Sequence, residues 1–226
     1  MSEERIFREV DEAVRHDQLK GLWDKYGVLV VAGAFAIVAG VGGYKFWVYW
    51  KAEQASNAGA RFVGGVTLLE DGKTSEAIEV FNSLADEGPS GYQKLAQFRL
   101  AAIFAKDGKT QDAVKIYDAL ASQSGIGAVQ QGFARIQAAA LRLDHASFDD
   151  MRKRLDALAV TGNPWRHSAR ELLGLSAFRT GKVNAAERYF NVMLSDAQTP
   201  ANMRQRAEMM LSLLVQSTGA SASAGK

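Results

Sequence analysis

DGKTSEAIEVFNSLA, residues 71–85, returns as DGKTQDAVKIYDALA at residues 107–121, with the DGKT turn and the pattern of small and apolar positions kept. A third copy, TGKVNAAERYFNVML, occupies residues 180–194, and a more divergent copy, DHASFDDMRKRLDALA, occupies residues 144–159. With Gly72, Gly108, Ala146 and Gly181 taken as equivalent, the spacings are 36, 38 and 35 residues. A period in this range is typical of stacked helical hairpins. The repeats therefore predict an all-α solenoid of about four hairpins.

Around each copy, small and large residues recur at fixed positions. The first helices carry a small residue where the two helices should cross: Gly65, Ala101, Ala139 and Gly174. The second helices carry a small residue followed four positions later by a ring: Ala77 and Phe81, Ala113 and Tyr117, and Ala186 and Phe190, with Met151 and Leu155 in the divergent copy. Small residues let helix axes approach to ~8–10 Å, and a ring fills the space between hairpins. These positions, with Pro89 closing the first copy, resemble the tetratricopeptide pattern.

The hairpin turns and the end of the array carry helix-boundary signals. In each DGKT turn, glycine favours a left-handed C-cap, and we expect Thr74 and Thr110 to act as the next N-caps. Residues 201–216 form a last apolar-striped helix that we expect to cap the solenoid. The final stretch, STGASASAGK at residues 217–226, is small and polar, which predicts a disordered tail.

A different pattern precedes the repeats, in the uncharged run GVLVVAGAFAIVAGVGGY at residues 27–44. Crossing a bilayer takes about 20 helical residues, and aromatic side chains favour both membrane boundaries. Such residues flank the run on each side: Trp23 and Tyr26 before it, and Trp47, Tyr49 and Trp50 after it. We expect one transmembrane signal anchor within residues 26–50, with Ala32, Ala36 and Gly40 at helix-packing spacing. The alternative is a cleaved signal peptide ending near Ala58, but the run and its charged leader are long for one.

The anchor divides the chain into parts on two sides of a membrane. Residues 1–25 carry the apolar stripe Phe7, Val10 and Val14 and are expected to form a cytoplasmic amphipathic segment. Residues 51–216 form the repeat domain, which we place outside the cytoplasm because long domains after a signal anchor translocate largely regardless of charge.

The residue inventory favours a binding protein over an enzyme. The 226 residues include no cysteine, which excludes thiol chemistry, and the net charge of +2 gives no nucleic-acid footprint. His16, His145 and His167 lie in separate segments without partners at metal-ligand spacing. We therefore expect no catalytic residue, metal site or cofactor.

A binding groove is expected instead on the first helices of the hairpins. The pattern places these residues there: Phe62, Val66 and Leu69; Leu95, Phe98 and Ala102; Phe133, Ile136, Ala140 and Leu143; and Glu171, Leu175 and Phe178. Such an apolar groove suits extended, incompletely folded polypeptide. Alternatively, the array curls up or forms a homo-oligomer and buries these side chains as core.

Taken together, the start REVDEAVRHDQLKGLWDKYG (residues 8–27), the single span and the hairpins resemble a bacterial family: the tetratricopeptide-like inner-membrane proteins that are ancillary subunits of the Sec translocon. The resemblance implies a periplasmic domain on an N-terminal anchor, with the Sec translocon, periplasmic chaperones and unfolded clients as partners. It implies no catalytic residues. The alternative function is a structural scaffold for envelope or division assemblies that binds no clients.

Overall fold

The computed structural model describes the backbone of residues 3–224 and the side chains of residue 20 and residues 23–216. Every regular element in these residues is an α-helix and no strand occurs among them, which confirms the predicted all-α class. The chain divides into two compact units, one ending at Asn57 and one beginning at Ala58, and helix α1 (Glu3–Glu70) contributes to both.

In the first unit, α1 contains the predicted span Tyr26–Tyr49 without interruption. Every side chain from Val28 to Trp50 is exposed, so no other part of this unit covers the apolar run. By length and composition, the helix is able to cross a membrane. The stripe predicted at Phe7, Val10 and Val14 lies outside the described side chains.

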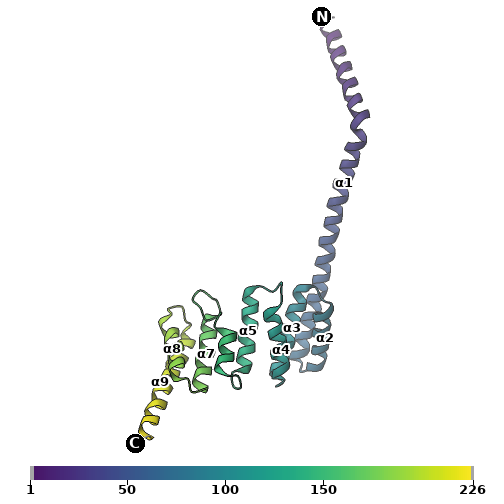
Figure 1. Ribbon diagram of the computed structural model, residues 1–226. Helices are drawn as coiled ribbons and strands as arrows, with labels where there is room; N and C mark the ends of the chain where they lie inside the picture. Colours follow the sequence, from purple (N-terminus) through teal and green to yellow (C-terminus); the bar gives the residue numbers. More distant parts are fainter. Residues whose placement is uncertain (1–2, 225–226) are drawn as a thin grey trace. The chain divides into compact units, whose positions relative to one another are not determined.

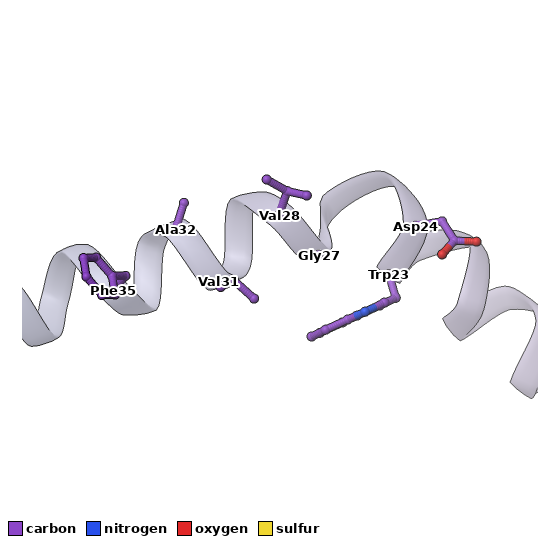
Figure 2. A pocket seen from close by; sticks show the side chains of 7 residues that line it. All are labelled: Trp23, Asp24, Gly27, Val28, Val31, Ala32 and Phe35. Carbon is purple, nitrogen blue, oxygen red and sulfur yellow. The ribbon is translucent and has the colours of Figure 1, made fainter.

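At the start of the apolar run, Trp23 lies against Gly27. Figure 2 shows the indole ring beside this glycine, where an added Cβ would lie 3.2 Å from the ring atom Cε2. The glycine therefore lets the tryptophan lie along its own helix at the edge of the run, as a boundary side chain would.

The second unit is the predicted row of hairpins, whose successive helices Figure 1 shows side by side. Its elements are residues 58–70 of α1, then α2 (Thr74–Glu87), α3 (Ser90–Lys106), α4 (Thr110–Ser122), α5 (Ala128–Arg142), α6 (Phe148–Leu155), α7 (Arg166–Arg179), α8 (Val183–Ser195) and α9 (Ala201–Ala224). The first helices are the end of α1, α3, α5 and α7, and the second helices are α2, α4, α6 and α8.

Three hairpins share one turn geometry. Gly72, Gly108 and Gly181 have positive φ angles of 78°, 75° and 69°. In the first turn, Lys73 N donates to Leu68 O at 2.8 Å and Gly72 N donates to Leu69 O at 3.2 Å, which is the Schellman pattern. The predicted glycine C-caps are confirmed, but the predicted threonine N-caps are wrong. Because the Schellman turn extends to the lysine, Lys73 and Lys109 occupy the N-cap positions and the threonines are the first helical residues.

Where the two helices of a hairpin cross, a glycine faces a phenylalanine ring. A Cβ at Gly65 would lie 2.9 Å from Phe81 Cζ, and a Cβ at Gly174 would lie 2.8 Å from Phe190 Cζ. Both rings are fully buried, at 0% and 1% exposure. The small residues therefore serve the purpose that their spacing predicts, which is to make room for the ring.

The third hairpin departs from this arrangement. Its turn has no glycine, and α6 starts from Ser147, whose Oγ accepts a hydrogen bond from Asp150 N at 3.1 Å. Met151 replaces the usual small residue and Leu155 the usual ring, and both are fully buried in one cluster with Ala139. Helix α6 ends early, at Leu155, and α5 also contacts α7 directly.

A buried polar cluster fixes the loop after α8 to the start of α7. The Asp196 carboxylate accepts hydrogen bonds from Arg166 Nε at 2.9 Å and from Arg170 Nη1 at 3.0 Å. Both arginines are buried, and the hydrogen bond from Arg166 holds the pKa of Asp196 far below its usual range. Beside them, His167 Nδ1 lies 3.1 Å from Thr199 Oγ1, and burial followed by the charge of Arg166 lowers the pKa of His167.

The last helix, α9, closes the array as expected for a cap. Ala207 and Leu214 are buried against Phe190 and Met193 of α8. The α9 backbone continues to Ala224, beyond residue 216 and into the segment for which the sequence predicts disorder. The alanines of that segment favour helix intrinsically, which the prediction from small polar composition did not weigh.

Two adjacent glycines test the helix crossing. Gly65→Ala places a methyl group against the buried Phe81 ring, and overpacking of this kind typically costs ~1–3 kcal/mol. Gly64→Ala meets nothing within 4 Å, and alanine is favoured over glycine in a helix by up to ~1 kcal/mol. Thermal unfolding of the full chain in detergent should show a lowered Tm for Gly65→Ala and an unchanged or raised Tm for Gly64→Ala. Equal shifts for both variants would contradict the crossing geometry.

The buried histidine predicts a pH dependence. Since the folded-state pKa of His167 is lowered, the unfolded chain takes up its proton first as the pH falls below ~6.5. This group's contribution to the free energy of unfolding is therefore full above ~6.5 and declines as the pH falls toward the folded-state pKa. The Tm measured across this range should decline less steeply in His167→Gln, while His145→Gln, at an exposed turn, keeps the wild-type slope. A His167→Gln slope equal to that of wild type would show that another group carries the effect.

Candidate protein-interaction surface

The first helices present the surface on which the binding groove is expected. We call the outward side chains of residues 58–70, α3, α5 and α7 the first-helix face. Among the predicted groove residues, Leu95 and Phe178 are exposed, at 49% and 36%. A larger group is half-buried: Phe62, Val66, Leu69, Phe98, Phe133 and Leu175. Ile136 is buried. Most of the predicted set therefore reaches the surface only in part.

Aromatic rings on this face contact one another from hairpin to hairpin. The Phe98 centroid lies 5.7 Å from that of Phe133, which lies 5.6 Å from that of Trp165. Phe98 also lies 6.3 Å from Tyr117 on α4. At the start of the array, Phe62 lies 5.4 Å from the buried Phe81. Phe62 and Phe98 are each partly exposed to solvent and partly packed against the core. The sequence predicts that rings of the groove and rings of the core are separate sets, and this separation does not hold for these two residues.

Ile136 is the clearest departure from the predicted groove. It is 7% exposed and belongs to the core cluster of Ala139, Met151 and Leu155. Side chains of both α6 and α7 cover it, since Met151, Leu155, Ala169 and Leu173 belong to the same cluster. Leu143 packs against the same cluster.

The one acid in the predicted groove is paired with the capping helix. Arg206 of α9 donates from Nε at 2.5 Å and from Nη2 at 3.0 Å to the two carboxylate oxygens of Glu171. This bidentate pair leaves the carboxylate little capacity to repel or attract a ligand.

Three further apolar side chains belong to the face, although the repeat pattern did not predict them. Val63 and Val129 are 64% and 55% exposed, and Trp165 is half-buried beside Phe133 with its Nε1 donating to Val129 O at 2.8 Å. Trp165 precedes α7 and the two valines fall at offsets that the pattern does not use. In the sequence, the only indication that these three residues belong to the face is that they are apolar and lie in or next to a first helix.

Groups with catalytic chemistry are engaged elsewhere or isolated. His167 is buried beside Thr199, and His145 lies in the exposed turn before α6. Within the part of the chain that the structure describes, no three His, Asp or Glu side chains converge as metal ligands. In the other unit, the predicted packing stripe Ala32, Ala36 and Gly40 is exposed, and a Cβ at Gly40 would meet nothing within 4 Å.

Comparison with known proteins agrees with this architecture. A family model described as a tetratricopeptide repeat-like domain matches residues 20–216, from just before the apolar run to within α9. Comparison with curated proteins gives no match, and comparison with solved structures gives none. Because the matched range covers most of its length, the chain belongs to the tetratricopeptide repeat-like domain family.

Proposed function

We propose that this protein is a membrane-anchored interaction module that receives extended, incompletely folded segments of translocating polypeptides. Repeat domains of this family are in general non-catalytic modules for protein–protein interaction. The carrying observation is the apolar first-helix face, with Val63, Leu95 and Val129 about half exposed or more. Exposed apolar side chains that recur along a surface are typical of protein-binding sites.

The proposed setting is the bacterial inner membrane. The apolar part of α1 serves as an uncleaved signal anchor, the N-terminus lies in the cytoplasm and the repeat domain lies in the periplasm. The exposure of every side chain from Val28 to Trp50 supports this setting, because lipid would cover them. The resemblance of the whole chain to ancillary subunits of the Sec translocon makes that channel and periplasmic chaperones the proposed partners.

The topology has a direct test. Alkaline phosphatase, which is active only outside the cytoplasm, should be active when fused after Lys226 in a bacterial host. Green fluorescent protein exported through the Sec pathway does not mature outside the cytoplasm, so the same fusion with it should stay dark. N-terminal sequencing of the full chain should return its original start. Fluorescence without phosphatase activity would reverse the orientation, and a mature start near Ala58 would mean a cleaved signal peptide.

Client binding should depend on the first-helix face. The full chain in detergent is expected to bind reduced, carboxymethylated α-lactalbumin and not the disulfide-intact protein. Leu95→Ala and Phe178→Ala should weaken this binding with little change in Tm, because both side chains are exposed. The matched control is Val192→Ala, which removes an exposed side chain from a second helix and should bind as wild type does. Phe98→Ala is unsuitable as a binding test, since its ring also packs against the core.

Two results would count against client binding. One is an equal loss of affinity in Leu95→Ala, Phe178→Ala and the control Val192→Ala, since binding would then not depend on the first-helix face in particular. The other is the absence of any binding to the reduced protein together with a single stable partner that co-purifies from membranes. That second result would favour the alternative function, a structural scaffold.

A further inference from the structure

Charge is unevenly distributed between α2, α3 and α5. Helix α3 contains Lys94, Arg99 and Lys106 and no acid, and α5 likewise contains only basic charges. Helix α2 carries the opposite charge, with four acids and no Lys or Arg: Glu76, Glu79, Asp86 and Glu87. In this part of the array, the positive charge lies on the first helices α3 and α5, where the apolar surface also lies.

On α3, basic and apolar side chains alternate along one stripe. Leu95, Arg99, Ala102 and Lys106 are spaced by four, three and four residues, which places them on the same side of a helix, and all four are exposed. Between α3 and the end of α1, this stripe borders a cavity of about 240 Å³. Leu69, Ala102 and Ile103 supply its apolar wall, and Arg99, Lys106 and Asp107 supply its charges.

Among the residues that the structure describes, the two cations of the cavity have no acidic partner. Arg99 lies over the Phe62 ring, with Cζ 5.8 Å from the centroid. Among the described residues, no carboxylate lies within ion-pairing distance of Arg99 or Lys106, Asp107 included. Some other cations of the domain are paired, as Arg154 is with Asp118 and Arg206 is with Glu171.

We infer that this site selects its polypeptide ligands for acidic residues beside an apolar side chain. The inference rests on the proposed function and names the chemistry that this part of the first-helix face recognises. Arg99 and Lys106 are seven residues apart on α3, which is ~10 Å along a helix. An extended polyproline-II-like segment places residues i and i+3 on one side, ~9 Å apart. The fitting ligand thus has Asp or Glu at i and i+3, with an apolar residue beside this pair.

Three fluorescent peptides of identical length and apolar content test this selectivity. They carry Asp, Asn or Lys at the two positions, and anisotropy with the full chain in non-ionic detergent reports their affinity. The Asp peptide should bind roughly three- to tenfold more tightly than the Asn peptide, as expected for two exposed ion pairs, and the Lys peptide should bind most weakly. Added salt should reduce the preference.

Charge-reversal variants locate the effect. Arg99→Glu and Lys106→Glu should each reduce or reverse the preference for the Asp peptide. Lys115→Glu reverses an exposed cation on the second helix α4 and should retain it. Tm measured for each variant separates loss of the site from loss of the fold. Because Arg99→Glu also removes the contact with Phe62, Lys106→Glu provides an independent measurement within the same site.

The outcomes separate this inference from the proposed function. Equal binding of all three peptides would overturn the inference and leave the interaction module intact. Failure of every peptide to bind would overturn both. Retention of the Asp preference in both Arg99→Glu and Lys106→Glu would show that the selectivity lies elsewhere. Displacement of the Asp peptide by phosphatidylglycerol micelles, with loss of that displacement in Arg99→Glu, would assign the cations to lipid instead.

Discussion

The close crossing of the two helices in a hairpin is the contact on which the repeat domain depends. At Gly65 and Gly174 there is no room for even one methyl group, because the rings of Phe81 and Phe190 occupy the space. Each ring also belongs to a core cluster that includes the next helix, α3 for Phe81 and α9 for Phe190. The same contact therefore sets the distance between the two helices of the hairpin and contributes to packing against the helix that follows. A solenoid has no central core, and its stability is therefore the sum of such local layers and their interfaces.

This packing also determines which side chains remain for binding. The second-helix rings Phe81, Tyr117 and Phe190 are buried in the core, whereas the first helices keep a surface that is apolar and, on α3, basic. The half-buried rings of Phe98 and Phe133 belong to both, since each supports the array and contributes to the surface. If the first-helix face binds polypeptide as proposed, substitutions at Leu95 and Phe178 should separate binding from stability, whereas substitution at Phe98 should affect both.

The parts of the fold that could be predicted are those encoded by short spacing in the sequence. Gly65, Phe81 and the glycine turns recur with the repeat period, so the pattern reveals them. The burial of Ile136 depends on contacts with α6 and α7, which no residue of α5 reveals. The cluster of Arg166 and Asp196 joins residues 30 positions apart without any periodic signal. Contacts of that kind depend on the exact path of the loops, and only the structure reveals them.

We propose that the first-helix face binds polypeptide substrates, while the second helices form the supporting layer. Site-specific photo-crosslinking in growing cells tests it most directly, with the photoreactive residue at exposed positions Leu95, Val129 or Phe178 and, for comparison, at Lys115 or Val192. We expect crosslinks to newly exported polypeptides from Leu95, Val129 and Phe178 and none from Lys115 or Val192. Crosslinks of equal yield from both sets, or from the second helices alone, would contradict it.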